Sequence, residues 1–161
     1  MKTVLLISLL GLTLIMIGCQ AEQADVLTAD EKIQLREDIT VRYNGWIDAA
    51  NQANIDSCAM FMAEDIHFAS NSRLLYGRET MVEAWRPGFE RIDHQNIRTT
   101  RSRITLLSPA VALQAAEASN FSTNAAGDTI GSSNIAFTFV WVKQDGEWVC
   151  RQAHQSTRQS Q

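Results

Sequence analysis

The stretch that decides the fold runs from Asn134 to Ser156 and reads NIAFTFVWVKQDGEWVCRQAHQS. It contains two runs of aromatic and β-branched residues, which are typical of strands, separated by a polar turn at 144–146. The Asp-Gly pair in that turn supplies the positive φ angles of a tight hairpin. The sequence therefore predicts two antiparallel strands, over 133–143 and 148–156.

Alternation along these strands predicts which side chains share a face, because successive strand residues point to opposite sides of a sheet. In the first strand one face collects large apolar residues, namely Ile135, Phe137, Phe139 and Trp141. In the second strand the neighbouring face is expected to carry Trp148, Cys150, Gln152, His154 and Ser156. Aromatic walls beside a few polar groups predict a small-molecule pocket on a concave sheet. The alternative is a closed aromatic core in which His154 bonds to the backbone.

The rest of the chain supplies helices first and strands afterwards. Thr28 and Glu31 form a capping box, and helical spacing after it predicts a buried stripe of Ile39, Tyr43, Trp46, Ile47 and Ala50. A short helix over 55–62, a strand and return strand over 63–76, and a third helix after Gly77 should follow. Pro87 should distort or end that helix. Strands over 96–107 and 110–121 complete an α+β fold, with N-terminal helices packed on a curved, mainly antiparallel sheet.

The N-terminus is expected to be a signal peptide that is cleaved from the mature protein. Lys2 precedes an almost wholly apolar run over 4–17, which is shorter than the ~20 residues of a membrane span and suits a signal peptide. A Gly directly before Cys19 matches a bacterial lipobox, in which the cysteine thiol carries the lipid. An ordinary secretory signal followed by a chance cysteine is the alternative.

These signals divide the chain into a lipoprotein signal peptide at 1–18, a lipidated Cys19 with a tether at 19–27, and a single domain at 28–158. Gln20, rather than Asp, favours the outer membrane, with the protein lipid-anchored in the bacterial cell envelope and facing the periplasm. Cleavage leaves 143 residues, with 13 basic against 18 acidic side chains. This acidic balance argues against a nucleic-acid partner. The membrane contact is therefore expected through the lipid on Cys19 alone.

The motif search excludes several classes of site. The three histidines form no metal-ligand pattern, so no metal is expected, and no cofactor motif is present. Cys58 and Cys150 could pair in an oxidising compartment, but spacing does not decide it, and two separate buried thiols are the favoured interpretation. Acid/base chemistry remains possible, with His154 on the last strand and Asp65 or His67 on the first as candidate catalytic residues.

Four stretches together carry a family resemblance: YNGWIDAANQANID at 43–56, MFMAEDIHF at 60–68, YGRETMVEAW at 76–85 and DGEWVCRQAHQS at 145–156. The domain resembles the SnoaL-like members of the nuclear-transport-factor-2-like superfamily, which share the cone-shaped α+β fold of ketosteroid isomerase. In the last stretch Trp148, His154 and Ser156 match a closing G-x-W-x-I-x-H-x-H-x-S strand. The resemblance implies a cone with an internal pocket and a tendency to dimerise across the sheet.

The resemblance does not imply one activity, because this fold hosts isomerases, cyclases, hydrolases and binders. The positions comparable to the ketosteroid-isomerase catalytic groups hold Trp46, Ser70 and Phe139, so that proton transfer is not expected. The first reading is an envelope lipoprotein that binds a small apolar or amphipathic molecule. An enzyme using His154 and a structural envelope protein are the alternatives. The expected pocket residues are Tyr43, Trp46, Trp85, Phe137, Phe139, Trp141, Gln152, His154 and Ser156, with His67 as a further polar group.

Overall fold

The computed structural model describes residues 27–70 and 72–159. Three helices are present in this part of the chain: α1 (Ala29–Asn51), α2 (Ile55–Ala59) and α3 (Arg78–Phe89). The strands are β1 (Met62–Ser70), β2 (Arg73–Tyr76), β3 (His94–Ser108), β4 (Val111–Thr123), β5 (Thr129–Gln144) and β6 (Glu147–Gln159). The expected signal peptide, Cys19 and most of the tether lie outside the described residues. Within them, no helix is long and apolar enough to cross a bilayer.

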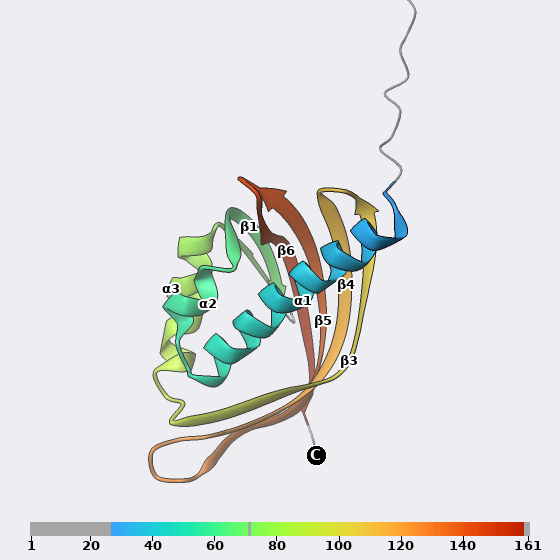
Figure 1. Ribbon diagram of the computed structural model, residues 1–161. Helices are drawn as coiled ribbons and strands as arrows, with labels where there is room; N and C mark the ends of the chain where they lie inside the picture. Colours follow the sequence, from blue (N-terminus) through green and yellow to red (C-terminus); the bar gives the residue numbers. More distant parts are fainter. Residues whose placement is uncertain (1–26, 71, 160–161) are drawn as a thin grey trace, which may run out of the picture.

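The six strands form one curved sheet in the order β2-β1-β6-β5-β4-β3. Every neighbouring pair is antiparallel except β1 and β6, which run parallel. All three helices lie on the concave side, with α1 crossing the long strands and α2 and α3 beside β1 (Figure 1). The predicted α+β architecture is confirmed.

Local sequence explains where the first helix begins. The Thr28 side chain accepts a hydrogen bond from the Glu31 amide at 3.2 Å, and the Glu31 carboxylate accepts one from the Thr28 amide at 2.7 Å. The hydrogen bonds that the Thr28 amide and hydroxyl donate to the Glu31 carboxylate favour the ionised acid and hold the pKa of Glu31 below its usual range. The predicted capping box is thus present. Of the predicted stripe, Ile39, Tyr43, Ile47 and Ala50 are buried and Trp46 is half-buried.

The core lies between α1 and the inner face of the sheet. The predicted inward set of β5 is buried throughout: Ile135, Phe137, Phe139 and Trp141. Gln114 of β4 is buried beside them, where its side-chain oxygen accepts a hydrogen bond from the Trp141 indole at 2.8 Å and its amide donates to the Ser102 hydroxyl at 2.9 Å. One buried polar pair is therefore satisfied inside an otherwise apolar core.

Several element boundaries differ from the sequence prediction. The second helix ends at Ala59, because the chain turns through Met60 and Phe61 directly into β1. Pro87 does not end α3, which continues to Phe89, where the Glu90 amide bonds the Arg86 carbonyl at 2.9 Å. A proline in the last turn removes only one helical hydrogen bond. The four long strands each run beyond their predicted C-terminal ends, while β4 begins one residue later than predicted.

Candidate functional site

A cavity with largely apolar walls lies between the C-terminal parts of α1 and α3 and the concave face of the sheet. Its volume is about 310 Å³, at the lower end of the ~300–1,000 Å³ typical of small-molecule sites. Residues from the start of β3 and β5 and the end of β4 and β6 line it, so it lies at the opposite end of the sheet from the β5–β6 hairpin. The apolar walls include Trp46, Trp85, Phe89, Ile97, Ile135 and Phe137.

Edge-to-face packing fixes the aromatic walls of this cavity. Trp46 meets Phe137 with ring centroids 5.3 Å apart at 87°, and Phe139 at 5.5 Å and 68°. On the other side, Trp85 meets Phe68 at 5.3 Å and 79°. Aromatic pairs of this geometry contribute ~0.5–1.5 kcal/mol beyond the area they bury. The protein itself therefore holds these rings in place.

Four polar side chains interrupt the apolar walls: Gln95, Asn120, Ser122 and Gln155. Gln95 and Ser122 are only 8% and 4% exposed. Among the described residues, the side chains of Gln95, Ser122 and Gln155 make no hydrogen bond, and the Asn120 Oδ1 atom is buried without a partner. Buried polar groups are nearly always hydrogen-bonded. Their clustering at one cavity indicates groups that are available to a ligand.

Backbone pairing brings one of these groups close to the cavity wall. Ser122 of β4 is the cross-strand partner of Gly131 in β5. A Cβ atom at Gly131 would lie 2.4 Å from the Ser122 hydroxyl oxygen. A side chain at Gly131 would therefore require the Ser122 hydroxyl to rotate away, and both residues line the cavity.

A smaller void continues inward from the cavity. It has a volume of about 40 Å³ and an apolar lining that includes Ile55, Met62, Phe68 and Met81. The two spaces share four wall residues: Trp46, Trp85, Phe89 and Gln155. Gln155 is the one amide that borders both spaces.

A β-bulge in β6 decides which polar residues reach the cavity. Trp141 pairs with Cys150, whereas the next residue of β5, Val140, pairs with Gln152. Arg151 is therefore an extra residue, and the alternation of the strand inverts after it.

The predicted common face of Trp148, Cys150, Gln152, His154 and Ser156 is consequently wrong in its second half. Trp148 and Cys150 are buried, whereas His154 and Ser156 are exposed. His154 pairs with Thr138 on the outer face, while Ala153 and Gln155 lie opposite Phe139 and Phe137 on the inner face.

The structure brings three of the predicted pocket residues to the cavity, namely Trp46, Trp85 and Phe137. Tyr43, Phe139 and Trp141 are buried in the core instead. The Tyr43 hydroxyl lies 2.9 Å from that of Thr99, and burial raises the pKa of the tyrosine.

The predicted acid/base candidates lie outside the cavity. His67 is exposed and packs edge-on against the Tyr76 ring, with centroids 5.1 Å apart. Asp65 is also exposed and forms an ion pair with Arg151. Since His154 lies on the outer face as well, the structure does not bring these side chains to the cavity, and their catalytic role remains a prediction.

Sequence reasoning missed Gln95, Asn120, Ser122 and Gln155. Part of the signal was present, because Ser122 continues the inward alternation of Ala116 and Ala118 along β4, and Gln95 stands two residues before the buried Ile97. A polar residue at an inward position near a strand end predicts a cavity group. Gln155 carried no such signal, because the bulge at Arg151 sets its direction.

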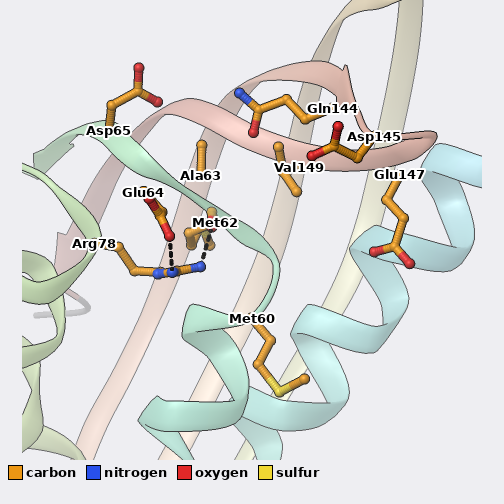
Figure 2. Close-up of a pocket in the computed structure, with 10 residues that line it drawn as sticks. All are labelled: Met60, Met62, Ala63, Glu64, Asp65, Arg78, Gln144, Asp145, Glu147 and Val149. Atoms are coloured by element: carbon orange, nitrogen blue, oxygen red, sulfur yellow. Dashed lines mark hydrogen bonds and ion pairs between the residues drawn. The ribbon is translucent and has the colours of Figure 1, made fainter.

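A wider groove of about 900 Å³ lies at the other end of the sheet (Figure 2). Its lining is partly polar, and its charged groups other than Asp145 have partners within the chain. Arg78 donates to the Glu64 carboxylate and to the Met62 carbonyl, both at 3.3 Å. Asp65 pairs with Arg151. The groove therefore offers few free groups to a ligand.

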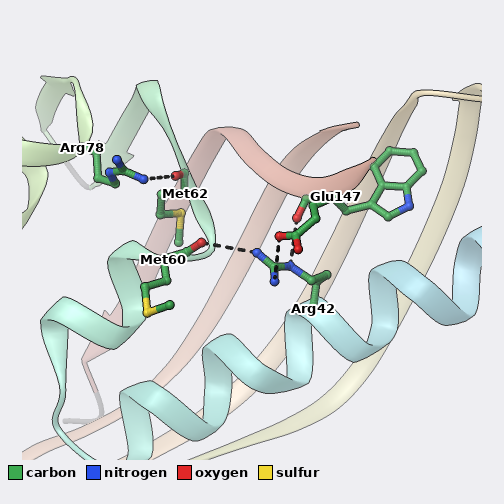
Figure 3. Close-up of polar contacts among 6 residues, drawn as sticks. Arg42, Met60, Met62, Arg78 and Glu147 are labelled. Carbon is green, nitrogen blue, oxygen red and sulfur yellow. Dashed lines mark hydrogen bonds and ion pairs between the residues drawn. The ribbon is translucent and has the colours of Figure 1, made fainter. Parts of the chain in front are cut away.

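Arg42 links three separate segments of the chain beside this groove (Figure 3). Its guanidinium donates to the Trp148 carbonyl at 2.9 Å and to the Met60 carbonyl at 3.3 Å, and it lies 3.7 Å from the Glu147 carboxylate. It also stacks over the Phe61 ring, 4.7 Å from the centroid. Arg42 thus joins α1, β6 and the α2–β1 turn, which is a structural role.

Ionisable groups are nearly absent from the lining of the 310 Å³ cavity. Arg91 is the one ionisable side chain among the described lining residues, and it is exposed. No group of three or more metal-ligating side chains occurs in the part of the chain that the structure describes. Cys58 borders the inner void, where burial raises the pKa of its thiol to about 12.

The sequence matches a known protein family. A family described as the SnoaL-like domain matches residues 39–159, which is most of the chain. The chain belongs to the SnoaL-like domain family. The predicted resemblance is confirmed, and the match includes β6 with its bulge.

Solved structures share the fold of this SnoaL-like domain at low identity. A protein provisionally named a scytalone dehydratase, from Novosphingobium aromaticivorans, is 12% identical with a TM-score of 0.72, over 81% of this chain and 89% of that chain. The protein LinA is 14% identical with a TM-score of 0.69, over 80% and 88%. A provisionally named calcium/calmodulin-dependent protein kinase II association domain from Xanthomonas campestris is 20% identical with a TM-score of 0.66, over 74% and 85%.

These neighbours differ in their names while sharing one architecture. At such identities the likeness shows the fold alone. No curated protein matches the sequence. Function must therefore be argued from the cavity itself.

Proposed function

We propose that this SnoaL-like domain binds a small molecule in the 310 Å³ cavity between its helices and sheet. The observation that carries the proposal is a set of four polar side chains, Gln95, Asn120, Ser122 and Gln155, that line a cavity with aromatic walls and have no hydrogen-bond partner among the described residues. The Asn120 Oδ1 atom is buried, and a filled core would leave it desolvated without compensation, which costs free energy. A ligand that donates and accepts hydrogen bonds would satisfy these side chains.

The alternative of an acid/base enzyme draws little support from this cavity. General acid/base catalysis needs a titratable side chain within reach of the substrate. The described lining offers Arg91 alone, and a guanidinium stays protonated in proteins. An enzyme using His154 or His67 would have to work on the outer face of the sheet, and one using Asp65 would have to work in the wider groove, where that carboxylate pairs with Arg151. Binding is therefore the better-supported function.

The binding proposal is tested with a thermal-shift screen of residues 20–161 against small organic molecules. A ligand at 100 times its dissociation constant adds about 2.7 kcal/mol of stability. Ala50→Leu adds a side chain at the cavity wall, and Ala115→Leu adds the same side chain at an exposed site on β4. We expect hits that Ala50→Leu weakens and Ala115→Leu leaves unchanged. No hit in a broad library, or equal loss in both variants, contradicts the proposal.

We also propose that the domain is held at the bacterial outer membrane by a lipid on Cys19, facing the periplasm. The apolar run at 4–17, the Gly-Cys pair and Gln20 support this. Labelling cells with radioactive palmitate tests it directly. The full chain should become labelled and fractionate with the outer membrane, and Cys19→Ser should abolish both. Label retained in that variant would rule the anchor out.

A homodimer through the outer sheet face is the remaining proposal on partners. Thr138, Val140 and Val142 lie half-buried on that face of β5. A row of β-branched side chains suits face-to-face packing of two sheets. Sedimentation of residues 20–161 should show a dimer that Val140→Lys converts to a monomer. A wild-type monomer at high protein concentration would exclude this association.

A further inference from the structure

The charge of the cavity limits what it can hold. Its described lining carries no carboxylate, histidine or lysine, and its one cation, Arg91, is exposed to water. A cation placed among Trp46, Trp85 and Phe137 would lose its hydration without gaining a counter-charge, and an anion would find only the solvated Arg91 guanidinium. Such burial is strongly unfavourable. The part of a ligand that enters the cavity is therefore uncharged.

The polar groups of the cavity indicate what the ligand must present. Gln95, Asn120 and Gln155 carry carboxamides, each of which offers both donors and an acceptor, and Ser122 adds a hydroxyl. A partner that satisfies them must also donate and accept. A ligand carboxamide does both, whereas a carboxylate only accepts and a hydrocarbon does neither.

The position of Gln155 indicates how a ligand would be oriented in the cavity. Gln155 borders both the 310 Å³ cavity and the 40 Å³ inner void, whose remaining lining is apolar apart from the Cys58 thiol. Within the described residues its amide makes no hydrogen bond. Gln155 therefore lies at the boundary between the apolar end of a bound ligand and its polar edge.

We propose that the cavity selects uncharged ligands with an apolar body and a carboxamide-like edge, and that Gln155 is the residue that determines this specificity. The inference rests on the proposed binding function and adds the ligand class to it. The bulge at Arg151 is what makes it possible, because it turns Gln155 rather than His154 toward the cavity. The site recognises hydrogen-bonding pattern and not charge.

Three matched probes test the ligand class: indole, indole-3-carboxamide and indole-3-carboxylate. They share one flat body and differ in the edge alone. Calorimetric titration of residues 20–161 at pH 7 should show the carboxamide binding about tenfold more tightly than either of the others, as expected for one or two added hydrogen bonds. A carboxylate that binds as tightly as the carboxamide overturns the proposal.

Gln155→Met tests the assigned residue, because methionine keeps the length of the side chain and removes its amide. The advantage of indole-3-carboxamide over indole should fall to about threefold or less, in keeping with a lost hydrogen bond. Gln152→Met, on the outer face of the same strand, is the matched control and should keep the full advantage. Circular dichroism checks that both variants fold. An unchanged advantage in Gln155→Met overturns the role of Gln155.

The result also separates this inference from the binding function. If none of the three indoles binds at millimolar concentration while other library compounds do, the ligand class is wrong and the binding function stands. If neither the indoles nor the library bind, the binding function fails as well. The affinities of the three probes are compared on the wild-type protein. A variant that misfolds therefore does not affect the test of the ligand class.

Discussion

Gln114 shows at the scale of one residue how a buried amide differs from the amides of the cavity. Its side chain is almost fully buried and is satisfied on both sides, by the Trp141 indole and the Ser102 hydroxyl. Gln95 is similarly buried and borders the cavity without a protein partner. The first amide stabilises the fold, and the second is available to a ligand.

Gln114→Met should therefore lower the free energy of unfolding by about 1–3 kcal/mol, because it leaves the Trp141 indole N–H buried without an acceptor. Urea denaturation of residues 20–161 measures this loss. Gln152→Met, on the outer face, should stay within ~0.5 kcal/mol of the wild type. A Gln114→Met protein as stable as the wild type would show that the hydrogen bond contributes nothing.

Cys58 predicts how stability depends on alkaline pH. Burial raises the pKa of its thiol to about 12 from an ordinary value near 9. Between these values the unfolded chain releases the proton and the folded chain keeps it, so stability is complete below pH 9 and falls as pH rises toward 12. The slope for one such group is ~1.4 kcal/mol per pH unit.

Cys58→Ala removes this thiol. The free energy of unfolding of the variant should therefore fall less between pH 9 and 11 than that of the wild type. Urea unfolding at a series of pH values measures both slopes. Cys150 is buried with a raised pKa as well and is retained in both proteins, so the difference reports on Cys58. Equal slopes would show that the Cys58 thiol is not desolvated.

At the scale of elements, the register of β6 is the feature with the largest consequence. Accessibility of introduced cysteines distinguishes the bulged strand from a regular one. Ala153→Cys should resist maleimide in the folded protein, and His154→Cys should react rapidly, because their positions face opposite sides of the sheet. The native thiols of Cys58 and Cys150 are buried and provide an unreactive background. Rapid labelling of Ala153→Cys with protection of His154→Cys would show that β6 alternates regularly, without a bulge at Arg151.

This strand also shows what the sequence could and could not predict. Alternation correctly placed Phe137 and Phe139 on the inner face of β5, because that part of the strand has no irregularity. One extra residue at Arg151 inverted the second half of β6, and a bulge leaves no periodic signal before the strands pair. The aromatic walls that β5 gives the cavity were therefore predictable, whereas the inward direction of Gln155 depended on tertiary register.

In the molecule as a whole, the Arg42 contacts that stabilise the fold and the cavity that binds a ligand lie at opposite ends of the sheet. Arg42 ties α1 to the start of β6 at Trp148, whereas Gln155 borders the cavity near the end of the same strand. Seven residues of strand separate the two positions, a span of ~23 Å. Sites this far apart without shared partners usually contribute additively to stability.

Arg42→Ala should lower the free energy of unfolding by about 1–3 kcal/mol, because the Trp148 and Met60 carbonyls lose their donor. Ligand affinity at 25 °C should stay the same, since the cavity is remote. Arg36→Ala, which loses only a bond within α1, is the matched control and should cost far less. Urea unfolding and calorimetric titration measure the two quantities.

The double variant Arg42→Ala/Gln155→Met completes this prediction. Its unfolding free energy should equal the sum of the single effects within ~0.5 kcal/mol. Its ligand preference should match that of Gln155→Met alone. A coupling of 1 kcal/mol or more, or a changed preference in Arg42→Ala, would mean that the sheet transmits strain between its ends. Additivity would instead mean that residues at the cavity end can change to suit different ligands without weakening the Arg42 contacts that hold the other end together.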